Sequence, residues 1–234
     1  MSASNTNNPA GNPTGNPAMN PALVPSSFAQ VRRIQTDVIQ RWHDLEPKID
    51  SWPSAQEVVA PQSEKGWANT CEKLQLINTY QWHEEDKSRA HGAGDEFLGA
   101  VKRSIDASNR RRVQTVDKLD DIIFNGLSES GNLNPQAPLN SESPGSIIDR
   151  LSVLMLKLYH VTEGRDTLSK ADGNADKIQA MQGQVDTLSE QIHDLGQCLD
   201  TLLQGIAAGS VRVKFYRQVK VYIDPNTGEI KSDL

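Results

Sequence analysis

The chain has 234 residues, a formal net charge of −6 and 23% charged residues, which suits one good-sized domain or two small ones. The acidic balance argues against a protein that coats nucleic acid or an anionic membrane surface. No apolar run is long enough to cross a membrane, and residues 1–24 lack the features of a secretory signal, so we expect a cytoplasmic protein without membrane insertion.

Residues 1–26 are predicted to form a disordered N-terminal tail. The dipeptide Asn-Pro recurs four times between residues 8 and 21. Proline at every fourth position is incompatible with a helix interior or a central strand, and the segment has few apolar side chains to bury. We therefore place a helical bundle domain at residues 27–209 and a β-hairpin segment, packed on the bundle, at residues 210–234.

Apolar residues separated by three and four positions predict the first three helices. The first covers residues 27–46, with Val31, Val38 and Trp42 in its stripe. Residues 49–62 contain two prolines and are expected to form a connection. The second helix covers residues 63–89 and ends before the glycine-containing turn at 92–94. A third helix follows at residues 95–124.

The second half of the chain predicts two further helices and a hairpin. After a loop rich in Gly, Asn, Ser and Pro at residues 125–143, a mostly apolar helix covers residues 147–161 and belongs in the centre of a bundle. Residues 175–208 carry an unbroken heptad seam, which favours antiparallel bundle packing or a coiled coil. Alternating residues up to 223 and a turn at 224–228 predict the hairpin. The expected fold class is therefore all-α, a bundle of about five helices with a short C-terminal β-hairpin.

Four sequence blocks, taken in order, resemble a bacterial family of unknown function, DUF4254. They are QWHEEDKSR at residues 81–89, KRSIDASNRRR at 102–112, SPGSIIDRLSVLMLKLYH at 143–160 and YRQVKVYIDPN at 216–226. The resemblance covers about residues 28–228. It implies no established activity, although members of the family are often linked with genes for bacterial surface polysaccharides.

Polar residues interrupt the apolar seams of the second and third helices. Glu85 and Arg89 follow Trp82 on the second helix, and Lys102, Asn109 and Arg112 occupy seam positions of the third. Burying charge costs several kcal/mol for each ion unless the charge is paired. Two interpretations stay open, a structural ion-pair network that fixes helix register and a polar pocket for an anionic ligand.

Asp149 is the one acidic residue near the start of the apolar fourth helix. It either complements the dipole of the first helical turn or faces the same polar centre as a base or a ligand contact.

A metal site and a nucleic-acid site are both weighed and not favoured. The pairs His83–Asp86 and His160–Glu163 lie three residues apart on helices, yet they match neither di-iron nor zinc-protease motifs. Two distant cysteines add no ligand spacing, so we predict no metal. The basic run at residues 110–112 is followed by acidic residues and lacks the aromatic residues that stack on bases, so we predict no nucleic acid.

The function predicted from these residues is a helical enzyme or ligand-binding protein with a pocket for an anionic small molecule. A sugar phosphate or nucleotide sugar is the first candidate. The sequence names no cofactor and leaves open whether the protein is an enzyme. The alternative is a non-catalytic helical adaptor that uses the long fifth helix for interaction. The candidate catalytic residues are His83, Glu85, Asp86 and Asp149, and the candidate ligand-binding residues are Arg89, Lys102, Asn109, Arg112 and His160.

Overall fold

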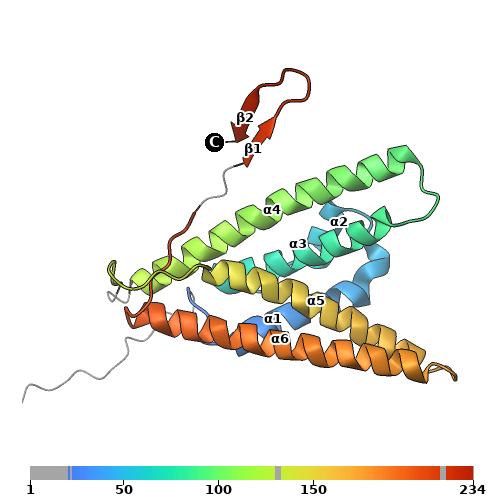
Figure 1. Ribbon diagram of the computed structural model, residues 1–234, viewed down its shortest axis with the longest axis horizontal. Helices are drawn as coiled ribbons and strands as arrows, with labels where there is room; N and C mark the ends of the chain where they lie inside the picture. The colour runs from blue at the N-terminus through green and yellow to red at the C-terminus, as the bar shows by residue number, and fades with distance from the viewer. Residues whose placement is uncertain (1–20, 22, 130–132, 217–219, 234) are drawn as a thin grey trace, which may run out of the picture.

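The structure, a computed structural model, describes residues 21, 23–129, 133–216 and 220–233, and over these residues it is mostly helical (Figure 1). The predicted helical fold class is thereby confirmed. Most of the predicted N-terminal tail lies outside the described residues. The helical elements are α1 (Phe28–Leu45), the 3₁₀ turn η1 (Glu46–Lys48), α2 (Trp52–Val58), α3 (Gly66–Ser88), α4 (Asp95–Ser128), α5 (Pro144–Leu168) and α6 (Ala175–Ala207).

Helix α2 lies where the sequence predicts a connection. Ser51 caps its N-terminus by accepting a hydrogen bond from the Ser54 N–H, and the Ser54 hydroxyl oxygen accepts one from the Ser51 N–H in return. Pro53 sits in the first turn, where a missing N–H costs no helical hydrogen bond. The proline therefore marks the start of a helix, and the prediction of an irregular connection at this point is wrong.

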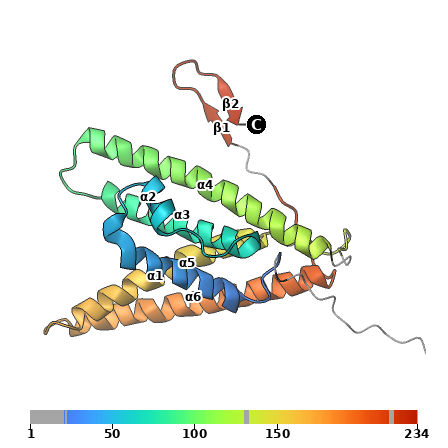
Figure 2. The ribbon, with the colours of Figure 1, turned by 180° about the vertical axis from the view of Figure 1, so that it is seen from behind.

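The helices form two long packed pairs, α3 with α4 and α5 with α6, and α1 packs against α3, α5 and α6 (Figures 1 and 2). The main core lies where these helices meet and contains Leu74, Leu119, Ile148 and Leu199, all fully buried. The α6 seam is buried only from residue 192 onwards, whereas its apolar residues between 178 and 188 are half-buried. The seam is therefore part of the buried core only over its second half.

The N-terminal residues just before α1 belong to the core. Val24 is 1% exposed and joins the main hydrophobic cluster, and the Pro21 carbonyl accepts a hydrogen bond of 3.0 Å from Trp67 Nε1. The predicted tail boundary at residue 26 is therefore too late, because a short apolar segment before the helix docks on the bundle.

The C-terminal segment has two short strands, β1 (Lys220–Ile223) and β2 (Ile230–Asp233), paired antiparallel with Ile223 opposite Ile230. They lie apart from the helices in both views (Figures 1 and 2). The side chains of Val221, Ile223 and Ile230 are 62%, 67% and 74% exposed. The prediction that this segment packs on the bundle is therefore wrong for these side chains, and the strands add no layer to a helical fold.

The stretch at residues 211–215, which alternates in sequence as a strand does, runs along the loop before α5. Leu139 and Arg212 form an isolated parallel bridge, and the Arg212 guanidinium donates to the Ala137 carbonyl at 2.8 Å.

None of the helices among the described residues combines the length and apolarity that spanning a membrane requires.

Candidate functional site

Two of the predicted polar residues, Arg112 on α4 and Asp149 on α5, form a two-pronged ion pair. Arg112 Nε and Nη2 donate to the Asp149 carboxylate at distances of 2.6 to 3.0 Å. Asn78 on α3 donates to Asp149 at 2.9 Å and also hydrogen-bonds Ser152. The pKa of Arg112 is raised above its usual value, mainly by its hydrogen bonds to Asp149, with a smaller contribution from the charge of Glu85.

Three other predicted seam residues of α3 and α4, Arg89, Lys102 and Asn109, do not join this network. Lys102 and Arg89 are exposed and pair along their own helices, with Asp106 and Asp86 respectively. Asn109 is exposed. The chain therefore uses these positions as solvated helix faces, and helical spacing alone did not reveal that.

A hollow of about 670 Å³ opens beside Arg112, between α4, α5 and α6. Arg150 and Lys157 add positive charge, and Glu142 and Asp194 add negative charge. Arg150 is paired with Glu142 at 2.7 Å. The hollow therefore combines a pre-positioned guanidinium and a lysine with apolar walls.

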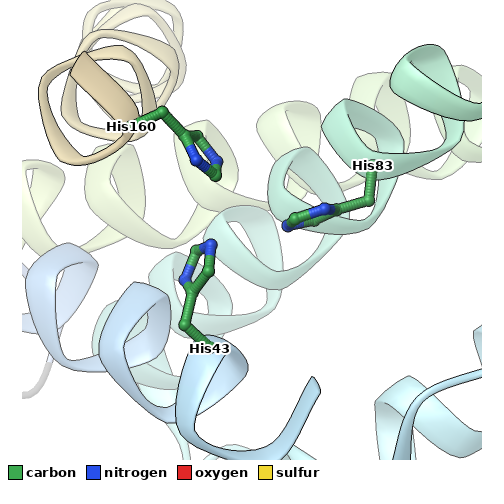
Figure 3. Close-up of side chains that lie close together, drawn as sticks. All are labelled: His43, His83 and His160. Carbon is green, nitrogen blue, oxygen red and sulfur yellow. The ribbon is translucent and has the colours of Figure 1, made fainter. Parts of the chain in front are cut away.

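A second site, which was not predicted from the sequence, lies where α1, α3 and α5 meet. His43, His83 and His160 point toward one another from these three helices (Figure 3). Their ring centroids are 5.0 to 5.6 Å apart. One nitrogen of each ring lies within 4.8 Å of one nitrogen of each of the other two.

One of the outward nitrogens of these rings has a hydrogen-bond partner. His43 Nδ1 lies 2.8 Å from the Ile39 carbonyl oxygen, which can only accept, so Nδ1 carries the proton. A carboxylate oxygen lies near each of the other two, with Glu46 3.4 Å from His83 Nδ1 and Glu163 3.8 Å from His160 Nδ1. All three Nε2 atoms are buried without a hydrogen-bond partner.

Each imidazole is stacked against an aromatic ring from another helix. In the sequence, that aromatic residue comes directly before one of the other two histidines. The stacked pairs, with centroid distances of 4.1 to 5.3 Å, are Trp42 with His83, Trp82 with His160 and Tyr159 with His43. The pattern is cyclic, because the aromatic residue beside one histidine supports the histidine of another helix. Such stacking fixes the ring planes, which a preorganised ligand set requires.

Burial keeps His83 and His160 uncharged. The pKa of His83 is lowered to about 4, chiefly by burial and then by the nearby charges of His43 and His160. The pKa of His160 is lowered as well, with burial again the main cause. At neutral pH these imidazoles are therefore in the neutral form that binds metal ions.

The residues present fit a transition-metal ion. Zinc binds imidazole nitrogens at about 2.0–2.1 Å, so three nitrogens in a tetrahedral site lie about 3.4 Å apart. From separations of 4.8 Å or less, the rings need to close in by roughly an ångström. The hydrogen bond of His43 Nδ1 to a backbone carbonyl is the outer contact usual around a ligating histidine, and a carboxylate lies near the Nδ1 atom of each of the other two.

The prediction of no metal is based on the two pairs His83–Asp86 and His160–Glu163, which match no known metal motif. It does not include His43, which lies 40 residues before His83. A usable signal was present, since each of the three histidines directly follows an aromatic residue, in the dipeptides Trp42-His43, Trp82-His83 and Tyr159-His160.

The model of a family described as "Protein of unknown function (DUF4254)" matches residues 68–215 of the chain. The matched segment includes His83 and His160, and His43 lies before it. No curated protein and no solved structure matches the chain.

Proposed function

The chain belongs to the DUF4254 family, whose description assigns no activity, and from the site itself we propose that the protein binds a divalent first-row transition metal at His43, His83 and His160. Zinc is the reference ion for this proposal. Imidazole ligands suit zinc, copper, iron and nickel, whereas magnesium and calcium prefer oxygen.

The observation that carries this proposal is the convergence of three imidazole rings whose Nε2 atoms are all buried with no hydrogen-bond partner. Buried polar atoms in proteins are nearly always satisfied, because an unsatisfied one costs about 1–3 kcal/mol. Three such atoms at one point are explained together by a single bound cation. The carboxylates of Glu46 and Glu163 would then orient the ligands from outside.

Three protein ligands are the number found in catalytic zinc sites, where the fourth position is left to water or substrate. A metal held this way lowers the pKa of its bound water and polarises carbonyl or phosphoryl oxygens. We therefore extend the proposal to a metal-dependent enzyme that acts on a small molecule by such Lewis-acid chemistry.

The test is a metal titration of the full chain after treatment with a chelator. We expect one Co²⁺ or Zn²⁺ ion per chain, with the visible absorption of four-coordinate cobalt. The variants His43→Gln, His83→Gln and His160→Gln should each weaken binding by about 100-fold or more, because each loses one of three ligands. His91→Gln and His193→Gln are the controls, since both histidines are exposed and lie outside the site.

Circular dichroism on every variant separates a lost ligand from a lost fold. Absence of metal binding by the native chain would overturn the proposal. So would equal affinity in the site variants and the controls.

A second candidate function, binding of an anionic small molecule, is favoured by the hollow beside Arg112. Asp149 occupies Nε and Nη2 of the guanidinium, and Lys157 also lines the hollow. A positioned guanidinium with a nearby lysine suits a phosphate group. Glucose 6-phosphate should raise the melting temperature where glucose does not, and Lys157→Gln should reduce that shift. Equal shifts with both sugars would contradict this candidate.

A further inference from the structure

A further hollow, of about 330 Å³, lies where α2, α3 and α4 meet. We propose that it binds a small phosphate monoester whose organic part is apolar. None of its lining residues lines the hollow beside Arg112 or belongs to the three-histidine centre, so this inference does not depend on either function proposed above.

The hollow is positively charged, although the whole chain has a net charge of −6. Its charged lining residues are Arg111 on α4 and Lys73 on α3, and no carboxylate is among the described residues that line it. The hollow beside Arg112, by contrast, includes Glu142 and Asp194. No ion pair among the described residues engages Arg111 or Lys73. Both charges are therefore available to an anionic ligand.

Arg111 is held by its flat face and not by an acidic side chain. It is half-buried, and its guanidinium carbon lies 4.7 Å from the centroid of the Trp52 ring. Such a cation–π contact uses the face of the guanidinium and leaves the N–H groups in its plane for other partners. Among the described residues, the hydrogen bonds of Arg111 involve its backbone and none of its side-chain N–H groups. A positioned guanidinium with unused donors suits an oxyanion.

The position of Arg111 also accounts for one part of the basic run at residues 110–112. Arg112 pairs with Asp149, and Arg110 is exposed on the same helix. No aromatic residue lies within the run itself, but Trp52 reaches Arg111 from α2. Three neighbouring arginines thus have three different surroundings, and only Arg111 lines this hollow.

The other walls of the hollow indicate what the anion carries. Leu76 and Ile77, which are 2% and 4% exposed, line it together with Pro61 and the Trp52 ring. An apolar group would cover these surfaces, whereas a bare ion would leave them in contact with water. The volume is near the lower end of the range for small-molecule pockets, about 300–1,000 Å³, so the ligand is compact. Two cations suit a phosphate monoester, which has a charge of about −1.5 to −2 at neutral pH.

The test is isothermal titration calorimetry of the full chain with three probes. Phenyl phosphate has both the charge and an apolar ring, inorganic phosphate lacks the ring, and benzyl alcohol lacks the charge. We expect phenyl phosphate to bind saturably and about tenfold or more tightly than either of the other two.

Variants with matched controls locate the binding. Arg111→Gln and Lys73→Gln should each weaken binding of phenyl phosphate about tenfold or more, because each removes a charged hydrogen-bond donor. Arg110→Gln and Lys177→Gln remove the same charges at exposed positions that do not line the hollow, and they should leave the affinity unchanged. Circular dichroism on every variant checks that the fold is retained.

Absence of phenyl phosphate binding would overturn the inference. So would equal losses in Arg111→Gln and Arg110→Gln, or binding of inorganic phosphate as tight as that of phenyl phosphate. Loss of binding in Lys157→Gln would place the ligand beside Arg112, and loss in His83→Gln would place it at the metal centre, and either result would also overturn the inference. Failure of the chain to bind a metal or glucose 6-phosphate would instead overturn the proposals made above and leave this one intact.

Discussion

Asp120 on α4 offers a substitution that should stabilise the protein at neutral pH. Its side chain lies at the start of α5, where it accepts hydrogen bonds from the Gly145 N–H at 2.6 Å and from the Ser143 hydroxyl at 2.5 Å. The residue is 5% exposed. Burial raises its pKa from 3.8 to about 6, with smaller opposing effects from the two hydrogen bonds. The charged form is therefore costly in the folded state.

The direction of the pH dependence follows from linkage. Because the pKa of Asp120 is higher in the folded state than in the unfolded state, its contribution to stability is fully present below about pH 3.8 and is lost as the pH rises through about 6. One pKa unit corresponds to about 1.4 kcal/mol, so the change from 3.8 to about 6 corresponds to about 3 kcal/mol.

Asp120→Asn keeps a neutral side chain at every pH. Its amide oxygen can accept from Gly145 and its NH₂ can donate to Ser143, so both contacts are retained. We expect the variant to match the native chain near pH 4 and to exceed its free energy of unfolding by about 3 kcal/mol at pH 7.

Urea unfolding of both proteins between pH 4 and 8 measures this difference. His83, whose pKa is lowered to about 4, contributes in the opposite sense, because its stabilisation is present above pH 6.5 and is lost as the pH falls through about 4. That contribution is common to both proteins and cancels in the comparison. A difference that does not change with pH, or a variant less stable at pH 7, would refute the reasoning.

Three further expectations concern the metal centre, the α6 seam and the N-terminal segment. Glu46→Gln should weaken zinc binding about tenfold in a chelator competition, and Glu163→Gln should weaken it less, because Glu163 is farther from its histidine and more exposed. Leu199→Asp should unfold the domain by circular dichroism, since it places an unpaired charge in the core, while Leu188→Asp should stay folded at a half-buried position. Val24→Ala should lower the free energy of unfolding by about 2 kcal/mol in urea titrations, because it removes fully buried methyl groups; an unchanged midpoint would contradict the docking of that segment.

The long helices could be predicted from the sequence because one physical rule governs them. A stripe such as Val31, Val38 and Trp42 has to face a core, and those residues are buried on α1. Helix α2 was not predicted because the sequence alone does not show whether a proline lies in the first turn of a helix or interrupts one. The hydrogen bonds of the Ser51 and Ser54 caps show that Pro53 lies in the first turn. Val24 was missed because two apolar residues beside a Pro-rich stretch carry no period.

The candidate site was harder to predict because its parts are joined only by tertiary packing. The sequence left open whether Asp149 faces the polar centre that contains Arg112, because no sequence rule pairs a residue of α4 with one of α5 across 37 positions. Seam spacing wrongly grouped the exposed Lys102 with Arg112. Helical spacing does not show which part of a long helix is covered by neighbouring helices and which part faces solvent. The three histidines follow no fixed spacing, and only the docking of α1, α3 and α5 brings them together.

The cyclic stacking of the three histidines also means that the site can be completed only late in synthesis of the chain. During synthesis α1 and α3 leave the ribosome first, and they carry only His43 and His83. Helix α5 then supplies both missing rings. His160 is the third imidazole, and Tyr159 is the aromatic ring that stacks on His43. A nascent chain without α5 therefore has the Trp42–His83 stack, but it lacks the aromatic ring that supports His43 and the third imidazole. Tight binding of a metal would require α5, so a metal-bound centre would show that α1, α3 and α5 have packed together.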